Sequence, residues 1–110
     1  MIFWNVGCPP CTAVFGNIND LFKEVNNPEL VSIGIGLNEK EEAEDQLKKT
    51  PLNATYLLHD ASRISGAYGI YEFPVYVLAD KDHNIKFAVR GGSPFVMPAL
   101  KKAIKEVLSK

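Results

Sequence analysis

The chain has 110 residues, enough for one domain with a real hydrophobic core. Its 12 basic and 13 acidic side chains leave a net charge of −1, which argues against a nucleic-acid or membrane-surface protein. Residues 1–19 are uncharged, but Asn, Gly and Pro interrupt them and no cationic start precedes them. We therefore expect neither a signal peptide nor a transmembrane helix there. The sequence predicts one domain over residues 1–110, monomeric, with no nucleic-acid or membrane contact.

The first predicted elements surround the two cysteines. An apolar run at 1–4 predicts a strand, and 5–7 a turn. The only cysteines, Cys8 and Cys11, follow, separated by two prolines, which suit the first turn of a helix because their missing N–H needs no partner there. We expect Cys8 at the N-terminus of a helix, Cys11 one turn inside, and the helix end just before Pro28. Its predicted buried stripe is Val14, Phe15, Ile18, Leu21, Phe22 and Val25.

The spacing of Cys8 and Cys11 predicts redox chemistry. The partial positive charge of a helix N-terminus favours a thiolate, the attacking species in disulfide exchange. A zinc site needs four ligands, and His59 and His83 lie too far apart in sequence to form a ligand pair, so we expect no metal. A purely structural disulfide is also disfavoured, because stabilising bridges usually close longer loops. We expect His83 to be exposed and His59 to have a satisfied structural role.

The middle of the chain alternates strands and helices. Residues 30–37 alternate with period two and predict a strand whose glycines would let a helix or backbone lie close. Asn38 and Glu41 have the spacing of a capping box, which would open a surface helix ending near Lys49. The simplest interpretation of the charged side chains on this helix is that they form a solvent-exposed face.

The second half predicts a short helix between strands and a closing helix. Residues 55–58 read as a strand, and Asp60 is expected to cap a helix over 61–68 that stops at Gly69.

Two strands at 75–79 and 85–89, joined by a turn rich in Asp and Asn, predict a hairpin. After the break at 91–92, a helix is expected from near Pro98. This element order predicts a three-layer α/β domain with a mixed sheet. The expected buried stripe of the last helix is Leu100, Ile104, Val107 and Leu108.

Several segments together resemble a known family. Phe3-Trp4 followed by Cys8-Pro9-Pro10-Cys11 resembles the active-site segment of thioredoxin-like proteins, and 68–70 with Phe73-Pro74 resembles the second half of that fold. The extra helix and strand within 38–58 are similar to the TlpA/ResA group of thiol-disulfide oxidoreductases, some of which serve cytochrome c maturation. The resemblance implies a thioredoxin fold, three-layer α/β/α with a mixed sheet and a central helix-strand insertion. The N-terminal strand departs from the family pattern, because we expect it to be shortened.

The same resemblance implies the catalytic residues. Cys8 would be the attacking cysteine and Cys11 the resolving one, together forming the redox-active disulfide. Pro74 would be a cis-proline facing them. Thioredoxins often keep a buried carboxylate six positions before the first cysteine, and Ile2 stands at that position here. Because residues 12–14 also contain no acid, no obvious group accepts the proton of Cys11.

The resemblance also implies a substrate-binding set. Phe73 would present backbone groups to an extended substrate segment. Trp4 would pack beside the active-site turn, and Gly91 or Gly92 would line the remaining edge of the groove, where a peptide approaches closely. Each has a structural alternative: Trp4 as core, Phe73 as a hydrophobic loop residue, and the glycines as strand terminators.

The expected function is thiol-disulfide exchange with protein cysteines, in the reducing direction. It needs no metal or organic cofactor, and its electrons would come from another dithiol protein. Two alternatives stay open: an oxidant that donates its disulfide, and a copper-binding chaperone of the same fold. The family resemblance favours a periplasmic or other extracytoplasmic location.

Overall fold

The computed structural model describes residues 1–91, 93 and 95–109. The order of helices and strands within them is the predicted one. The elements are β1 (Ile2–Trp4), α1 (Pro9–Val25), β2 (Ile33–Gly36), α2 (Lys40–Lys49), β3 (Tyr56–Leu58), α3 (Ser62–Ala67), β4 (Val75–Ala79), β5 (Ile85–Arg90) and α4 (Val96–Leu108).

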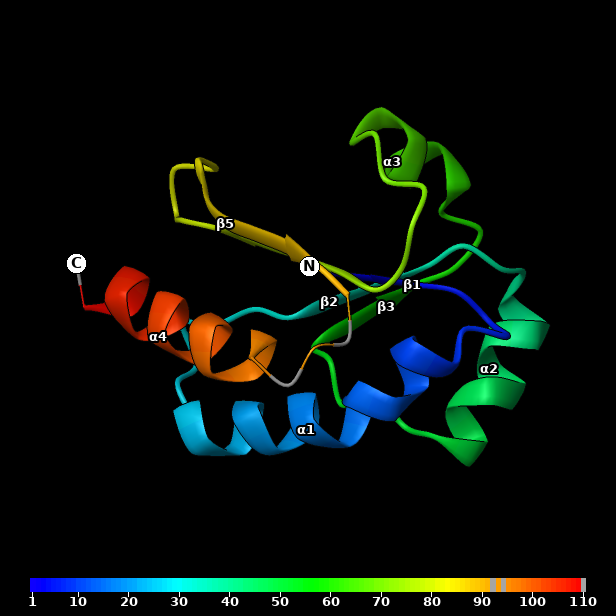
Figure 1. Cartoon of the computed structure of the whole chain (residues 1–110), viewed down its shortest axis with the longest axis horizontal. Helices are drawn as coiled ribbons and strands as arrows, with labels where there is room; N and C mark the ends of the chain where they lie inside the picture. The colour runs from blue at the N-terminus through cyan, green and yellow to red at the C-terminus, as the bar shows by residue number, and fades with distance from the viewer. Residues whose placement is uncertain (92, 94, 110) are drawn as a thin grey trace.

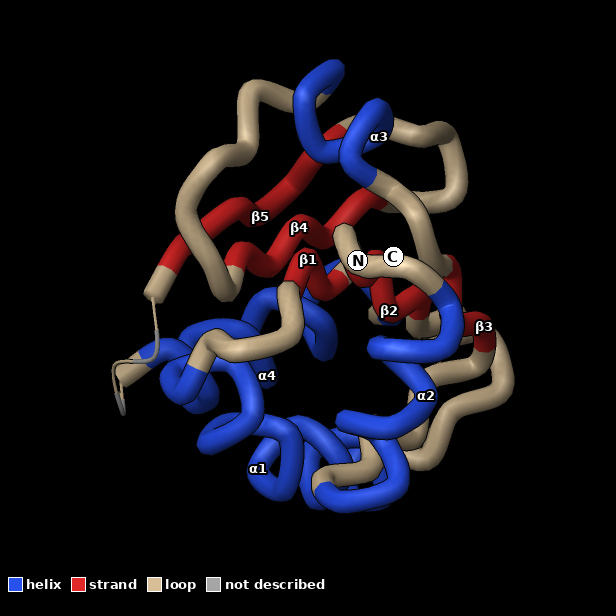
Figure 2. The backbone as a smooth tube through the Cα atoms, turned by 90° about the vertical axis from the view of Figure 1, so that its right-hand side faces the viewer, coloured by secondary structure: helices blue, strands red, loops and turns tan. Residues whose placement is uncertain are grey.

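The strands form one mixed sheet in the order β3-β2-β1-β4-β5. β1, β2 and β3 run parallel, whereas β4 pairs antiparallel with both β1 and β5. Figure 1 shows α1 and α4 below the sheet and α3 above it, and Figure 2 shows the same layers from the side. The three-layer prediction is therefore confirmed. The carboxyl ends of the three parallel strands meet at one edge, and the cysteine segment follows β1, the central strand of the whole sheet.

The larger core lies between the sheet and α1, α2 and α4. Because side chains alternate across a strand, Trp4 points into this core, where its ring meets Phe15 edge to face at 5.4 Å. Gly36 lies on the neighbouring strand, and a Cβ there would come within 3.1–3.2 Å of the Trp4 ring. The small residues of β2 thus make room for side chains, an indole here and leucines at Gly34, and not for a helix or backbone as expected.

The opposite face of the sheet has a smaller core under α3. It consists of Phe3, Ile35, Ala61 and Val77, and Phe3 also contacts the Tyr68 ring at 5.6 Å. Since α3 has only 6 residues, this face is covered less completely than the other.

Two element boundaries differ from the prediction. The strand expected over 30–37 is confined to β2, and Val31 is 53 % exposed because it precedes the paired segment. The last helix begins at Val96, before the expected Pro98, and buries Val96 against the larger core.

Both predicted helix caps are wrong. Helix α2 has Glu39 at its N-cap position without a side-chain cap, and Asn38 instead accepts a hydrogen bond from the Val6 backbone N–H at 2.7 Å. Ala61 is the N-cap residue of α3. Asp60 has a left-handed backbone (φ 52°), and its N–H donates to the Asn38 carbonyl at 2.9 Å. Both polar residues therefore connect loops and do not start helices.

The β4–β5 hairpin is confirmed, and its turn is organised by Asp80. The Asp80 carboxylate accepts hydrogen bonds from the N–H groups of Asn84 and Asp82, each at 2.9 Å. The bond from Asn84 has the largest effect on the pKa of Asp80, and together these bonds hold that pKa below its usual value. His83 is exposed in this turn, as predicted.

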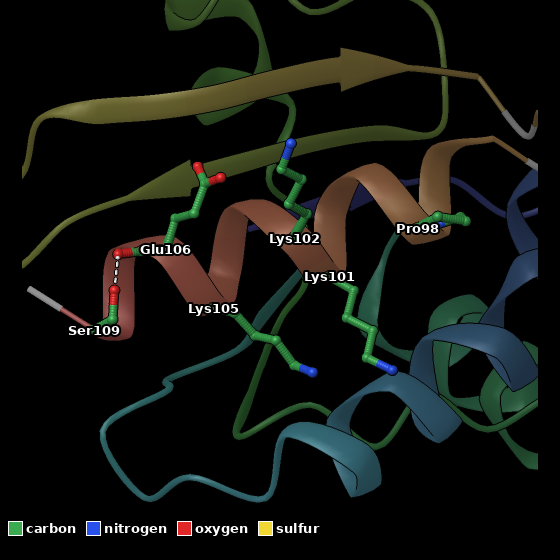
Figure 3. A pocket seen from close by; sticks show the side chains of 6 residues that line it. All are labelled: Pro98, Lys101, Lys102, Lys105, Glu106 and Ser109. Carbon is green, nitrogen blue, oxygen red and sulfur yellow. Dashed lines mark hydrogen bonds between the residues drawn. The ribbon is translucent and has the colours of Figure 1, made fainter.

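Helix α4 carries an ion pair and a surface hollow. An ion pair between Lys101 and Glu24 joins α4 to α1. A hollow of about 460 Å³ lies along α4, far in sequence from the cysteines (Figure 3). In the part of the chain that the structure describes, no helix combines the length and apolarity needed to cross a bilayer. The residues lining the hollow are Pro98, Lys101, Lys102, Lys105, Glu106 and Ser109.

Tyr76 provides a test of the larger core. Its side chain is 1 % exposed, and the described residues give its hydroxyl no hydrogen-bond partner. Burial raises the pKa of Tyr76 to about 12. Tyr76→Phe is therefore expected to leave stability unchanged or raise it by up to about 1 kcal/mol at neutral pH, because an unsatisfied buried hydroxyl is lost.

The effect of Tyr76→Phe should depend on pH. The raised folded-state pKa means that the unfolded chain releases this proton first, so Tyr76 lowers stability as pH rises from 10 towards 12. The advantage of Tyr76→Phe in urea unfolding should thus grow between neutral pH and about pH 11. Tyr71→Phe, at a 78 % exposed position, is the control and should show no such growth. An equal difference at both pH values would contradict the burial of the hydroxyl.

Candidate active site

The two cysteines form a disulfide at the N-terminus of α1, with their Cα atoms 5.3 Å apart. Cys8 is the N-cap residue with an extended backbone, and Pro9 and Pro10 occupy the first two helical positions. Cys8 is half-buried, whereas Cys11 is 0 % exposed. The predicted placement of the pair is confirmed.

The turn before Cys8 is fixed by backbone geometry and by one asparagine. Gly7 has a φ of 75°, which side chains disfavour, so a glycine suits this position. The Asn38 side-chain oxygen accepts the hydrogen bond from the Val6 N–H. The Asn38 side-chain nitrogen donates to the Glu42 carboxylate at 3.3 Å. The loop after β2 thereby supports the loop after β1. Asn38 was predicted only as a helix cap, so this supporting contact was missed.

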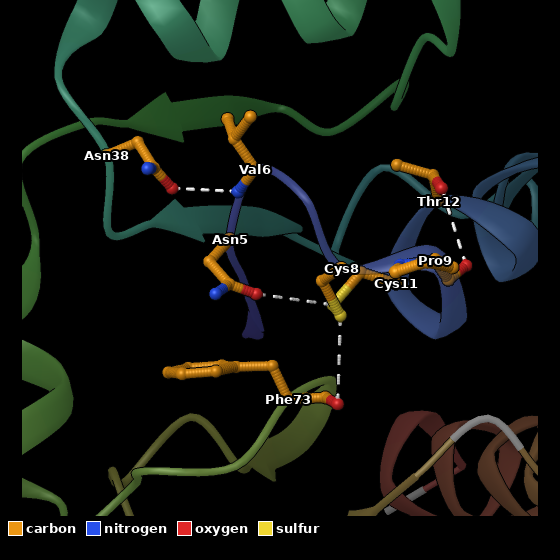
Figure 4. The surroundings of a disulfide bond; sticks show 8 residues. All are labelled: Asn5, Val6, Cys8, Pro9, Cys11, Thr12, Asn38 and Phe73. Carbon is orange, nitrogen blue, oxygen red and sulfur yellow. Dashed lines mark hydrogen bonds between the residues drawn. A yellow bond between two sulfur atoms is a disulfide. The ribbon is translucent and has the colours of Figure 1, made fainter.

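A second loop faces the disulfide. The Phe73–Pro74 peptide bond is cis, as predicted. The Phe73 carbonyl oxygen lies 3.8 Å from Cys8 Sγ, which Figure 4 shows across the gap between the two loops. Gly91 adjoins this loop, since its N–H donates to the Pro74 carbonyl at 2.8 Å. Its φ is 98°, and a Cβ there would have no atom within 4 Å. Gly92 lies outside the described residues.

Trp4 does not reach the surface beside the disulfide. Its side chain is 1 % exposed and packed on Phe15, so it has no face to offer a substrate. The predicted substrate-binding role of Trp4 is therefore wrong, and its structural alternative as a core residue is correct. The reason is the strand alternation that turns Trp4 towards α1.

Asn5 is a site residue that the sequence did not indicate. It follows β1 directly, and its Oδ1 lies 3.9 Å from Cys11 Sγ (Figure 4). In the disulfide neither sulfur carries a proton, so this is a contact and not yet a hydrogen bond. After reduction, the Cys11 thiol is placed to donate to the Asn5 oxygen. Only the position of Asn5 at the end of a strand leading into the cysteines could have suggested this.

Charged groups near the site are paired elsewhere or exposed. Arg90, at the end of β5, forms an ion pair with Glu72 at 3.0 Å. His59 is half-buried and its Nδ1 has no partner among the described residues, so the expectation of a satisfied role is wrong. Across residues 1–91, 93 and 95–109, no three His, Cys, Asp or Glu side chains gather as a metal site would require.

Solved structures with the same architecture include two that are named as thiol-disulfide proteins. A putative thiol:disulfide interchange protein DsbE from Chlorobium tepidum superposes with a TM-score of 0.87 at 21 % identity, covering 97 % of this chain and 77 % of that one. StoA from Bacillus subtilis superposes with a TM-score of 0.77 at 19 % identity, covering 94 % of this chain and 78 % of that one. A secreted Mycobacterium tuberculosis disulfide oxidoreductase homologous to E. coli DsbE superposes with a TM-score of 0.73 at 23 % identity, covering 96 % of this chain and 78 % of that one. These likenesses establish the thioredoxin fold.

Sequence comparison supplies the family. No curated protein matches the chain in sequence. Residues 1–88, which include both cysteines and the cis-proline, match the AhpC/TSA family. The matched region runs from β1 into β5 and thus covers most of the domain, with the disulfide and its facing loop inside it. The chain therefore belongs to the AhpC/TSA family, with a cysteine pair at the active-site position of a thioredoxin fold.

Proposed function

We propose that this protein is a thiol-disulfide oxidoreductase that reduces disulfides of other proteins. The Cys8 thiolate attacks a substrate disulfide, forms a mixed disulfide and releases one substrate thiolate. Cys11 then attacks the Cys8 sulfur, the second substrate thiolate leaves, and the Cys8–Cys11 bridge is formed. A dithiol protein returns two electrons and two protons to the pair. No metal or organic cofactor enters this sequence.

The unequal exposure of the two sulfurs supports this proposal most directly. A partner can reach the half-buried Cys8, whereas Cys11 is 0 % exposed and can react only with a sulfur already bound to Cys8. This division assigns attack to Cys8 and resolution to Cys11. A structural disulfide needs no such asymmetry.

The loop at Phe73 and Pro74 is the proposed docking edge. The Phe73 carbonyl faces Cys8, so a substrate strand lying along this loop would bring its disulfide to the exposed sulfur. The Gly91 position leaves open space where a side chain would stand. We include Gly91 in the substrate edge on that ground.

The surroundings of Cys8 support the reducing direction. A strong oxidant needs its thiolate stabilised by donors or cations. Here Pro9 and Pro10 have no N–H, and the first two N–H groups of α1, on Cys11 and Thr12, both donate to the Cys8 carbonyl. The Phe73 oxygen near Cys8 Sγ is an acceptor, which disfavours a thiolate. With Arg90 engaged by Glu72, no described cation is directed at the sulfur.

The direction can be tested by equilibrating the protein with a series of glutathione or dithiothreitol buffers. We expect a reduction potential below about −200 mV, in the range of reductants and mild exchangers. A potential above about −150 mV would identify a disulfide donor instead and would contradict the proposed direction.

The names of the relatives support an extracytoplasmic location. One similar structure is a secreted Mycobacterium tuberculosis protein, and another is an exposed lipoprotein thioredoxin of Streptococcus pneumoniae, with a TM-score of 0.76 at 18 % identity. We propose the same side of the membrane for this protein, with secreted or surface proteins as substrates.

A further inference from the structure

The resolving step raises a question about protons. Cys11 must lose its thiol proton before it attacks Cys8, yet its sulfur is enclosed. No Asp, Glu, Lys, Arg or His among the described residues is buried. The other titratable side chains of the hydrophobic cluster that contains Cys11 are Cys8 and Tyr76, and Tyr76 keeps its proton below about pH 10.

A neutral side chain, that of Asn5, lies beside the Cys11 sulfur where a titratable group would otherwise be expected. Its Oδ1 is 3.9 Å from Cys11 Sγ, and it is the one side-chain amide that the described residues bring to hydrogen-bond distance of that sulfur. An asparagine amide has an acceptor at one end and two donors at the other. The described residues show no hydrogen bond that ties down the amide nitrogen of Asn5, so the group can turn.

We propose that Asn5 is a catalytic residue that binds the Cys11 sulfur in both protonation states. Its oxygen accepts from the resting thiol, and its amide nitrogen donates to the thiolate as Cys11 attacks. In that step the Cys11–Cys8 bond forms, the bond from Cys8 to the substrate sulfur breaks, and the substrate leaves with the electron pair. The Cys11 proton finishes on the departing substrate thiol. This role rests on the proposed function.

The expected effect follows from comparing the two hydrogen bonds. A bond to a charged partner is roughly twice as strong as one to a neutral partner, so losing the amide harms the thiolate more than the thiol. Asn5→Ala should therefore slow the resolving step about tenfold at neutral pH. The pH at which the resolving rate reaches half its maximum should rise by about one unit.

The test uses reduced protein and excess dithiobis(nitrobenzoate), which reports each step by the nitrothiobenzoate released. Attack by Cys8 gives a first phase that depends on reagent concentration. Resolution by Cys11 gives a second phase that does not. The second phase should slow and shift in pH in Asn5→Ala, while the first phase stays within about twofold. Asn17→Ala changes an exposed asparagine on α1, the helix that carries Cys11, and should match the wild type in both phases.

The outcomes separate the two proposals. If the wild type shows both phases and Asn5→Ala resolves at the wild-type rate with the wild-type pH midpoint, the role of Asn5 is overturned and the function stands. If the wild type releases only one nitrothiobenzoate per protein, Cys11 does not resolve and the proposed function itself fails. An intact first phase in each variant shows that the fold is preserved.

Discussion

Replacing Cys8 with serine is expected to abolish disulfide exchange, while replacing Cys11 with serine should trap the protein on its substrates. Serine cannot form the mixed disulfide, so Cys8→Ser loses the first covalent step completely. Cys11→Ser retains that step but cannot resolve it. Mixed disulfides of Cys11→Ser should therefore accumulate and appear as adducts in non-reducing electrophoresis that a reductant removes.

Alkylation of the reduced protein tests the same assignment without a substrate. Cys8 is half-buried at a helix N-terminus and Cys11 is 0 % exposed, so iodoacetamide should modify Cys8 at least about tenfold faster. The two single-serine variants give the separate rates, each acting as the control for the other. Equal rates, or adducts formed by Cys8→Ser in place of Cys11→Ser, would contradict the division between attacking and resolving cysteines.

The sequence predicted best those parts of the site that depend on local chain geometry. Cys8 begins a helix because the two prolines after it fit only the first turn, and this constraint lies within four residues. The hairpin was equally predictable, since Asp80 organises a tight turn through its own neighbours. The cis bond before Pro74 followed from the family resemblance and not from any local signal.

The sequence predicted poorly the contacts that join loops distant in the chain. Asn38 has the spacing of a helix cap, and its partner Val6 is 32 positions away, so nothing local distinguishes the two roles. The pairing of β1 with β2 decides the matter, because it brings the ends of both strands together. Asn5 was missed for a related reason. Its neighbour Cys11 approaches only after the chain has turned at Gly7 and begun α1.

Trp4 shows how a motif can mislead about a side chain. Its place beside the cysteines suggested substrate contact, whereas the period-two alternation of β1 turns it into the core together with Ile2. Phe3, between them, points to the opposite face. The alternation was visible in the sequence, but which face α1 would cover was not.

Trp4→Ala should be the most destabilising single substitution considered for this protein. The change removes a ring that is 1 % exposed and packed against Phe15, and it leaves a cavity over Gly36. Such truncations cost about 3–5 kcal/mol, a large share of the roughly 5–15 kcal/mol that stabilises a domain. Urea unfolding should be followed by circular dichroism, because Trp4 is the only tryptophan and its fluorescence is lost.

Two further variants separate a core role from a substrate role. Tyr71→Ala removes an aromatic ring that is 78 % exposed and should change stability by no more than about 0.5 kcal/mol. Trp4→Phe keeps an apolar ring in the core, and it loses an indole N–H that has no partner among the described residues. It should therefore be less destabilising than Trp4→Ala and should alkylate at Cys8 at the wild-type rate. A Trp4→Ala protein as stable as the wild type but slow towards protein disulfides would restore the substrate role, because a residue acting only in the core must affect folding first.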